Sequence, residues 1–226
     1  MHQSALIAGE VFFRSYCAGA PVRVLDVGAQ DINGSLRLVA PPGTQYVGVD
    51  MVAGKGVDVV LTDPYRYPFE AESFDVVVST SCFEHDPLFW LSFLEIGRVL
   101  KPGGCLYLNA PSNGPYHPHS SDNWRFYPDA GKALAEWARR NRVALELVES
   151  FILNQMDHIW NDFVAVFRKG EPALPAAYMH TSFPGATNIW TAYAAELARR
   201  TDMPEDKRRL DHLVRAVVQG VKAVSG

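Results

Sequence analysis

Short apolar runs, each bounded by turn residues, recur along the first two-thirds of the chain. They lie at 22–27, 45–50, 57–61, 74–79, 104–109 and, further on, near 143–152 and 162–168. Apolar runs of this length without strict alternation are typical of strands that are covered on both faces. The pattern therefore predicts an α/β fold built around a mostly parallel sheet.

Helical spacing appears between strands where the connecting segment is long enough. The residues that show it most clearly are Leu88, Leu91, Leu94 and Val99. Asp86 and Pro87 are placed to act as N-cap and first helical residue, and the Lys101–Gly104 segment ends the helix. A second helix is expected at about 129–141. Strand, helix and strand then follow one another in the right-handed crossover sense.

The sequence changes character after Lys169. Residues 170–184 contain Gly and Pro and predict a linker, which two helical stretches follow. In the second stretch one helical face is apolar, formed by Leu210, Leu213, Val214, Val217, Val218 and Val221. Three roles stay open for this face: it covers the parent domain, closes over a substrate as a lid, or pairs with a second subunit in a homodimer. We therefore divide the chain into residues 1–169 and an extension, 170–226.

Two successive strands end in residues that are suited to a nucleoside. The first carries Asp26 and Gly28 at its end, and the second ends at Asp50 about twenty residues later. In an open parallel sheet, ligands bind beyond the carboxyl ends of the strands, where the strand order reverses. Gly28 lets the backbone approach a ligand closely, and Asp50 can accept two hydrogen bonds from a ribose diol.

The glycine pattern of a dinucleotide site is absent. After Gly28 come Gln30 and Asp31, and the next glycine is Gly34, so G-x-G-x-x-G is not formed. Without glycines that admit a pyrophosphate, a nucleoside that lacks phosphates is the better prediction. An NAD-dependent oxidoreductase is disfavoured for the same reason.

Four motifs in order carry a family resemblance. VLDVGAQDINGS (24–35), YVGVD (46–50), FDVVVSTSCFEH (74–85) and VLKPGGCLYLNAPSNG (99–114) resemble the successive motifs of class I S-adenosylmethionine (SAM) dependent methyltransferases of the type 11-like group. The resemblance covers residues 22 to about 169. Within it, NAPSNGPYH and DNWRFYPDAG resemble methyltransferases of bacterial polysaccharide and sugar-modification clusters. Gln30 departs from the pattern, because the first motif usually has a second glycine there.

The resemblance implies a Rossmann-like fold and a set of cofactor contacts. The fold would be a mostly parallel seven-stranded sheet with an antiparallel edge strand, followed here by a C-terminal helical extension. SAM would be the cofactor and S-adenosylhomocysteine its product. The implied cofactor residues are Asp26, Gly28, Ala29, Gln30, Asp50, Met51, Thr62, Asp63, Thr80 and Ser81. Asp26 has a second interpretation, as a strand-end acid that fixes the turn.

A hydroxyl acceptor must lose a proton during methyl transfer, which requires a general base. His85 follows the fourth strand directly and faces the carboxyl end of the sheet, and an imidazole titrates near neutrality. His117 and His119, in the loop after the fifth strand, are the other candidates. A structural or cofactor-ordering role for His85 stays open as well.

The loop from Asn109 to Tyr127 alternates polar and aromatic residues, as a binding loop for a sugar would. Its candidate acceptor-binding residues are Tyr116, Asp122, Trp124 and Arg125. Trp124 offers a flat apolar face, and Arg125 can hold a phosphate or carboxylate. In the alternative interpretation, Trp124 anchors the core and Arg125 forms a structural ion pair. His117, His119 and Asp122 are residue types that bind metals, but their spacing does not establish convergence, and no metal is assigned.

Composition narrows the function classes. The 226 residues are 48% hydrophobic and carry a formal net charge of −4, which argues against a nucleic-acid partner. No apolar run approaches the ~20 residues that span a membrane, and the N-terminus lacks the features of a signal peptide. The odd number of cysteines, Cys17, Cys82 and Cys105, predicts reduced thiols and a cytoplasmic location.

The sequence thus predicts a SAM-dependent methyltransferase that acts on a small polar acceptor, a sugar hydroxyl in glycan or nucleotide-sugar metabolism. Two alternatives within the fold are an N-methyltransferase and a natural-product O-methyltransferase. A third is a methyltransferase-like subunit that binds SAM without transferring a methyl group, which the glycine-poor first motif would suit.

Overall fold

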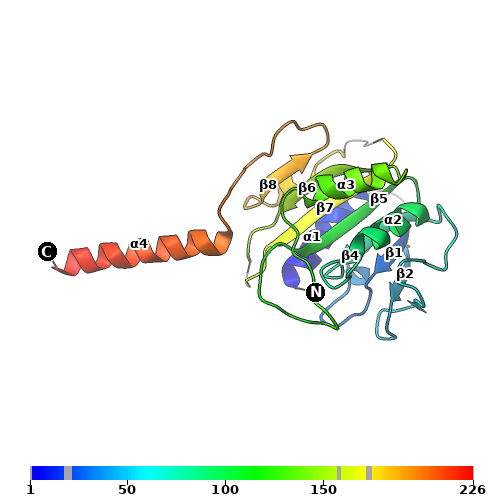
Figure 1. The fold of residues 1–226 in the computed structure, drawn as a ribbon, viewed down its shortest axis with the longest axis horizontal. Coiled ribbons are helices and arrows are strands. Elements are labelled where there is room, and N and C mark those ends of the chain that lie inside the picture. Colours follow the sequence, from blue (N-terminus) through cyan, green and yellow to red (C-terminus); the bar gives the residue numbers. More distant parts are fainter. Residues whose placement is uncertain (1, 18–21, 157–158, 172–174, 226) are drawn as a thin grey trace.

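The computed structural model describes residues 2–17, 22–156, 159–171 and 175–225. Eight strands form one sheet in the order β3-β2-β1-β4-β5-β7-β6-β8 (Figure 1). Their bounds are β1 Arg23–Val27, β2 Gln45–Asp50, β3 Val59–Val60, β4 Phe74–Thr80, β5 Leu100–Pro111, β6 Leu145–Ile152, β7 Asp162–Lys169 and β8 Thr187–Thr191. The seven strands that the sequence predicts are all present, and the eighth lies in the C-terminal extension.

The strand order reverses beside β1, which places a ligand crevice there. The chain runs from β1 outward to β2 and β3, then returns to pair β4 with the other side of β1, and all these pairs are parallel. β5 continues the parallel part, whereas β7 is antiparallel to both β5 and β6. In an open sheet such a reversal point is where ligands bind, beyond the carboxyl ends of the strands.

Helices and loops cover both faces of the sheet. Alternate strand residues point to opposite faces, and apolar residues on both faces have to be buried. Leu25 and Val77 face a core that includes Phe93 of α2 (Phe89–Val99), and this core also takes residues of α3 (Ala130–Arg140). Val24 and Val76 face a second core on the other side of the sheet. α2 begins at Phe89, after the expected Asp86–Pro87 start, because the Asp86 carboxylate accepts from the Leu88 amide (2.9 Å) and holds the preceding turn.

The second core contains an N-terminal helix that the sequence patterns did not indicate. α1 (Gln3–Tyr16) buries Phe12 against Tyr107 of β5, with ring centroids 4.8 Å apart. Small residues bring α1 close to its neighbours. A Cβ at Gly9 would lie 2.3 Å from a methyl carbon of Leu36.

A fully buried carboxylate joins α1, β6 and the C-terminal extension. Glu149 on β6 accepts hydrogen bonds from the Tyr16 hydroxyl (2.5 Å) and the Met179 amide (2.7 Å). Its second oxygen contacts the His180 amide (3.1 Å) and His180 Nδ1 (2.8 Å). Met179 and His180 belong to the short helix η2 (Met179–Ser182), within the segment predicted as a linker.

Two helical stretches were predicted after that segment, and the prediction of the first is wrong. Residues 187–191 form β8, which pairs antiparallel with β6. The Ala- and Arg-rich residues that follow favour a helix by propensity, but the edge of β6 offers unpaired backbone groups, and the Ile189 and Ala198 amides and carbonyls also pair with each other (2.8 and 2.9 Å). Tertiary hydrogen bonding therefore overrides the local preference.

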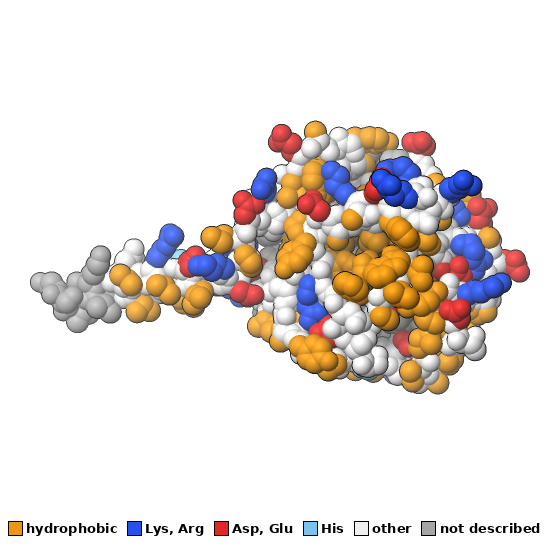
Figure 2. Space-filling view, in the orientation of Figure 1, with side chains coloured by type: hydrophobic (Ala, Val, Ile, Leu, Met, Phe, Trp, Pro, Cys, Tyr) orange, Lys and Arg blue, Asp and Glu red, His pale blue; other side chains and the backbone are white. Residues whose placement is uncertain are grey.

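The second predicted stretch is a helix, α4 (Glu205–Ser225), which extends away from the domain (Figure 1). Its first turn is fixed, because the Glu205 carboxylate accepts from the Gln155 amide (2.8 Å) and Asn161 Nδ2 (2.7 Å). Its apolar face is exposed (Figure 2), with side chains between 47% and 65% accessible at Leu210, Leu213, Val214, Val217 and Val218. That face does not pack on the sheet domain. Among the described helices, none is both long and apolar enough to cross a membrane.

Gly97 of α2 tests how tightly the helix layer is packed. A Cβ added there would lie 2.3 Å from Val143 Cγ1 and 3.0 Å from Leu145 Cδ1. We expect Gly97→Ala to destabilise the protein by about 1–3 kcal/mol through overpacking, offset by the ~1 kcal/mol that alanine gains over glycine in a helix. Urea unfolding measures the net loss.

Val143→Ala in the same background provides the control, because it removes the clashing methyl group. The double variant should lose less stability than the sum of the two single variants. A Gly97→Ala protein that is more stable than the unsubstituted chain, as the helix-propensity gain alone would make it, would contradict the packing described here.

Candidate functional site

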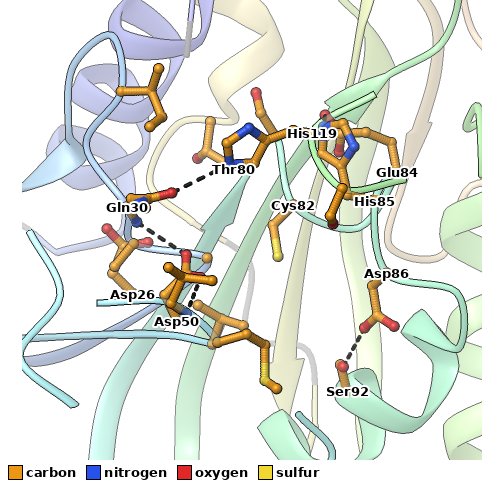
Figure 3. Close-up of a pocket in the computed structure, with 18 of the residues that line it drawn as sticks. Asp26, Gln30, Asp50, Thr80, Cys82, Glu84, His85, Asp86, Ser92 and His119 are labelled. Atoms are coloured by element: carbon orange, nitrogen blue, oxygen red, sulfur yellow. Dashed lines mark hydrogen bonds and ion pairs between the residues drawn. The ribbon is translucent and has the colours of Figure 1, made fainter. Parts of the chain in front are cut away.

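A cavity of about 860 Å³ lies at the carboxyl ends of β1, β2 and β4 (Figure 3). Its walls come from the turn after β1, the end of β2, the β4–α2 connection and the loop at 111–121 after β5. Val27, Asp50 and Thr80, at the ends of the three strands, all line it. The cavity therefore occupies the crevice that the strand order creates.

Gly28 lets the ends of β1, β2 and β4 come together. Its φ of +81° suits glycine, and its amide donates to the Val49 carbonyl (3.0 Å). A Cβ on Gly28 would lie 2.5 Å from Cys82 Cβ. The sequence suggested that this glycine admits a ligand, whereas the structure shows that it also makes room for Cys82. Burial raises the pKa of the Cys82 thiol, which keeps the thiol protonated.

Gln30, where the resembled motif has a glycine, bridges two segments of the cavity wall. Its amide lies 3.3 Å from Asp50 Oδ2, and its side-chain oxygen lies 3.3 Å from His119 Nε2. The remainder of the side chain packs on the loop after β2, where a Cβ at Gly54 would lie 2.7 Å from Gln30 Nε2. Gln30 therefore connects the turn after β1 with the loop after β5.

The Asp50 carboxylate retains hydrogen-bonding capacity toward the cavity. Oδ2 accepts from the Gln30 amide (3.3 Å) and Oδ1 from the Val52 amide (3.2 Å), both at the long end of the range. Because each carboxylate oxygen can accept two hydrogen bonds, both oxygens can accept another from a diol. The residue lies at the end of β2, partly buried and in the cavity wall.

Asp26 is buried and already has a partner. Tyr46 donates its hydroxyl to Asp26 Oδ2 at 2.7 Å. Burial raises the pKa of Asp26 to about 6, although the hydrogen bond from Tyr46 and the charge of Arg37 act in the opposite direction. The partner of the carboxylate is thus a side chain of β2, not the turn backbone that the strand-end interpretation expected. Asp26 also lies in the cavity wall, as its predicted ligand role requires.

The other expected cofactor residues divide into two groups. Ala29, Met51, Thr80 and Ser81 line the cavity. Thr62 and Asp63 are exposed and do not line it; Asp63 instead accepts from the Tyr65 amide at 2.9 Å. Tyr65, which the sequence did not single out, lines this end of the cavity and donates its hydroxyl to Asp86 (3.1 Å).

All three candidate bases line the cavity and lie together. The His85 ring centroid is 5.1 Å from that of His117 and 6.2 Å from that of His119. His85 Nδ1 lies 2.5 Å from the Ser121 carbonyl. Partial burial lowers the pKa of His85, which favours the neutral ring near pH 7. Figure 3 shows His85 and His119 on the same side of the cavity.

Glu84 is a cavity residue that the sequence analysis did not select. Its side chain is 1% exposed, and Oε1 lies 3.7 Å from His85 Nε2. Oε2 is buried and has no hydrogen-bond partner among the described residues. Burial raises the pKa of Glu84 to about 8. The available signal was a charged residue shortly after a strand end, in the FEH segment, directly before His85, which was already a candidate base.

Hydrogen bonds attach the loop after β5 to this segment. The Asn123 and Trp124 amides donate to the Glu84 carbonyl (2.7 and 3.1 Å). Ser121 Oγ donates to the His85 carbonyl (2.7 Å). These contacts between residues about 37 positions apart bring His117 and His119 to His85, which sequence spacing alone could not establish.

None of the four expected acceptor-binding residues lines the cavity. Arg125 forms a two-bond ion pair with Asp122 (2.6 and 2.8 Å) and donates to the Pro115 carbonyl (2.8 Å). The hydrogen bonds from Arg125 hold the pKa of Asp122 well below its usual range. Trp124 packs on Phe89 and donates to the Asp86 carbonyl, and Tyr116 is 75% exposed. The structure thus gives Arg125 the ion pair that was the alternative, with Asp122 as its partner. Trp124, which is 37% exposed, is not the core anchor that this alternative expected.

Comparison with known proteins relates part of this chain to methyltransferases. Residues 25–108 match the family model described as a methyltransferase domain, Methyltransf_11. Phosphoethanolamine N-methyltransferase 2 of Caenorhabditis elegans is 30% identical over 119 residues, 46% of this chain and 26% of that protein. The ubiquinone/menaquinone biosynthesis C-methyltransferase UbiE of Bartonella tribocorum is 30% identical over 125 residues, 54% of this chain and 46% of that protein. The chain thus spans less than half the length of both relatives.

Solved structures share the fold. The 1,6-didemethyltoxoflavin-N1-methyltransferase of Burkholderia thailandensis, solved with bound 1,6-didemethyltoxoflavin and S-adenosylhomocysteine, has a TM-score of 0.57 at 20% identity over 75% of this chain and 80% of that chain. The [4+2]-cyclase SpnF has a TM-score of 0.54 at 18% identity over 74% of this chain and 82% of that chain. This chain therefore has the class I methyltransferase fold, and its residues 25–108 match a methyltransferase domain.

Proposed function

We propose that this protein is a SAM-dependent methyltransferase that acts on a small polar acceptor. The observation that carries the proposal is the position of Asp50, at the end of β2, with spare acceptor capacity in a cavity at the point of strand-order reversal. The match of residues 25–108 to a methyltransferase domain supports it. So does the S-adenosylhomocysteine bound to the Burkholderia thailandensis enzyme of the same fold.

The residues present fit this cofactor. The ribose diol of SAM would donate to Asp50, and the methionine portion would lie along Gly28, Ala29 and Gln30, with Asp26, Thr80 and Ser81 nearby. Met51 would contact the adenine. Thr62 and Asp63, proposed for the adenine amino edge, would have to reach it from outside the present cavity wall. The chain lacks a glycine at position 30, so the Gln30 side chain would border the methionine portion.

The protein's contribution to transfer is orientation and proton removal. SAM is an activated donor, so holding nucleophile, methyl carbon and sulfur in line supplies much of the acceleration, on the order of 7–11 kcal/mol. We propose that one of His85, His117 and His119 takes the proton of a hydroxyl acceptor. All three border the cavity on its loop side.

For the acceptor we propose a sugar hydroxyl in glycan or nucleotide-sugar metabolism, held by the loop after β5. Polar side chains in the cavity wall, among them Asp86 before α2, Ser92 of α2 and Ser121 of the loop, support a hydroxyl-rich molecule. Tyr116, Asp122, Trp124 and Arg125 would then act on the acceptor through the shape of the loop, or contact the part of a larger acceptor that lies outside the cavity.

Two alternatives have support of their own. An N-methyltransferase is favoured by the names of two similar proteins, which act on phosphoethanolamine and on N1 of a toxoflavin precursor. A SAM-binding protein without methyl transfer is favoured by SpnF, which has this fold and is described as a [4+2]-cyclase. Assays of amine and hydroxyl acceptors distinguish the first alternative, and the absence of methyl transfer to any acceptor favours the second.

The cofactor proposal is tested at Asp50. Isothermal titration with S-adenosylhomocysteine should show micromolar or tighter binding, and Asp50→Ala should weaken it by about 1.5–3 kcal/mol, the range for hydrogen bonds to charged groups. Asp202→Ala is the matched control, because it removes an exposed Asp in the segment between β8 and α4. This variant should bind as the unsubstituted protein does. Equal affinity in the Asp50 variant would remove Asp50 from the ribose site.

The base proposal is tested by turnover at saturating SAM. His85→Ala, His117→Ala and His119→Ala are each compared with His212→Ala, which removes an exposed histidine of α4. We expect at least one of the first three to lower kcat by about tenfold or more, since general-base catalysis contributes about 10²–10⁴-fold. If none does, the histidine-base proposal fails while the cofactor proposal stands.

We further propose that the exposed apolar face of α4 joins two copies of the chain. Leu210, Val214 and Val217 follow the four-and-three spacing of a coiled-coil seam. Light scattering after size exclusion should then give the mass of a dimer, and Val214→Asp with Val217→Asp should give a monomer that still binds S-adenosylhomocysteine. Arg208→Ala, on the same helix, should leave the dimer intact. A monomeric unsubstituted protein would end this proposal.

A further inference from the structure

Glu84, His85 and His117 come together in the cavity wall, although they belong to two segments of the chain. One ligand atom from each, a carboxylate oxygen and a ring nitrogen of either histidine, lie within 4.8 Å of one another. Two imidazoles and one carboxylate form a common ligand set for divalent transition metals. We propose that these three residues bind such an ion, with zinc or manganese as the best candidates.

The histidines are held as metal ligands usually are. A ligating histidine normally donates its second ring nitrogen to a backbone carbonyl or a carboxylate, which fixes the ring. His85 Nδ1 meets the Ser121 carbonyl at 2.5 Å. His117 Nδ1 lies 3.2 Å from the Asp122 carboxylate, 3.3 Å from the Pro115 carbonyl and 3.2 Å from Arg125 Nη2. The Ser121 carbonyl can only accept, so His85 donates through Nδ1 and keeps Nε2 for an ion. Arg125 Nη2 can only donate, so an ion at Nε2 of His117 requires the tautomer whose Nδ1–H faces the Pro115 or Asp122 oxygen.

Glu84 would supply a negative charge to the ion, and it has a carboxylate oxygen that lacks a hydrogen-bond partner among the described residues. Its Oε2 is buried without a hydrogen-bond partner among the described residues, and a buried polar atom of this kind costs free energy unless something satisfies it. The Glu84 Oε1 to His85 Nε2 separation is 3.7 Å. Ligand distances of about 2.0–2.2 Å require the three side chains to move inward by roughly half an ångström. Because His117 is on a loop, this movement does not disturb the sheet.

The ligand set differs from the one that the sequence suggested. His119 contacts Gln30, and Asp122 is bonded to Arg125 and to the His117 amide, so neither has an oxygen or nitrogen directed to a common point with His117 and His85. In the proposed site Asp122 orients a ligand. Three protein ligands leave at least one coordination position open, as in catalytic metal sites, and all three residues line the cavity.

A role for the ion rests on the proposed function, although the site itself does not. A hydroxyl acceptor that occupies the open position would lose its proton more readily, because a bound divalent ion lowers the pKa of a coordinated oxygen. With His85 and His117 as ligands, His119 is the candidate base left to take that proton. The oxygen lone pair would then form a bond to the methyl carbon while the carbon–sulfur bond breaks, which leaves S-adenosylhomocysteine. Methylation of a neutral amine would need no such ion.

Metal titration of the chelator-treated protein tests the site. We expect one equivalent of Zn²⁺ or Mn²⁺ to bind with micromolar or tighter affinity, and Mg²⁺ far more weakly, because imidazole ligands disfavour it. Glu84→Gln and His117→Ala should each weaken Zn²⁺ binding by at least about tenfold. His212→Ala and His119→Ala, which remove histidines outside the ligand set, should change it less than threefold. Co²⁺ bound in place of zinc should show visible absorption bands that the His117 variant loses.

The outcomes separate this inference from the proposed function. Failure of the unsubstituted protein to bind Zn²⁺ or Mn²⁺ in a one-to-one ratio, or equal binding by the His117 and His212 variants, overturns the metal site. Titration of the same samples with S-adenosylhomocysteine reports on the cofactor site independently. Cofactor binding without metal binding rejects the inference alone, and metal binding without cofactor binding rejects the proposed function alone. Circular dichroism and the unfolding midpoint identify a variant that loses binding because it fails to fold, in which case His117→Gln replaces it.

Discussion

The cavity depends on how closely the ends of β1, β2 and β4 approach one another, and Gly28 is the residue that permits it. Its amide and that of Ala29 both donate to the Val49 carbonyl, which fixes the turn on β2, while Cys82 occupies the space where a side chain would be. Any larger residue would meet Cys82 and would be strained at a φ of +81°. Both Asp50 and the Glu84–His85 segment depend on this contact, because Asp50 follows Val49 directly and Glu84 lies two residues after Cys82.

The loop after β5 completes the cavity through polar contacts rather than apolar packing. Its buried Asp122 neutralises Arg125 in two hydrogen bonds, and Arg125 holds the Pro115 carbonyl, so the loop is folded on itself. The Glu84 carbonyl then accepts two amides of the loop. A loop held in this way places several of its polar residues along the cavity wall. Three histidines with different surroundings thus border one ligand site, one beside a buried carboxylate, one beside an ion pair and one beside Gln30.

The sequence predicted the parts of the fold that depend on local patterns. Buried strands are continuous apolar runs, so seven strands, and with them Gly28 and Asp50, could be placed from the sequence. The helix of Gln3–Tyr16 was missed because alanine, serine and glycine form much of its buried face, and β8 was missed because its partner β6 lies about 40 residues earlier. The contact of His117 with Glu84 depends on the folding of a long loop, which no spacing rule describes. Arg125 shows the same limit. Its carboxylate partner, Asp122, lies three residues away, but this spacing alone does not decide between an ion pair and an arginine that is free to bind a ligand.

The C-terminal extension contributes to the sheet domain through Glu149, in addition to carrying the projecting helix α4. A carboxylate that is fully buried on β6 receives two of its donors, the Met179 and His180 amides, from residues beyond 169. Without residues beyond 169, the Glu149 carboxyl group would be buried near Phe151 without these two donors, which costs free energy. The edge of β6 would also lose β8 and would be open to pairing with other chains. The boundary at residue 169 separates two patterns of sequence but not two folding units. A recombinant protein cut there would be expected to aggregate, so the smallest piece of this chain suited to biochemical work extends through β8.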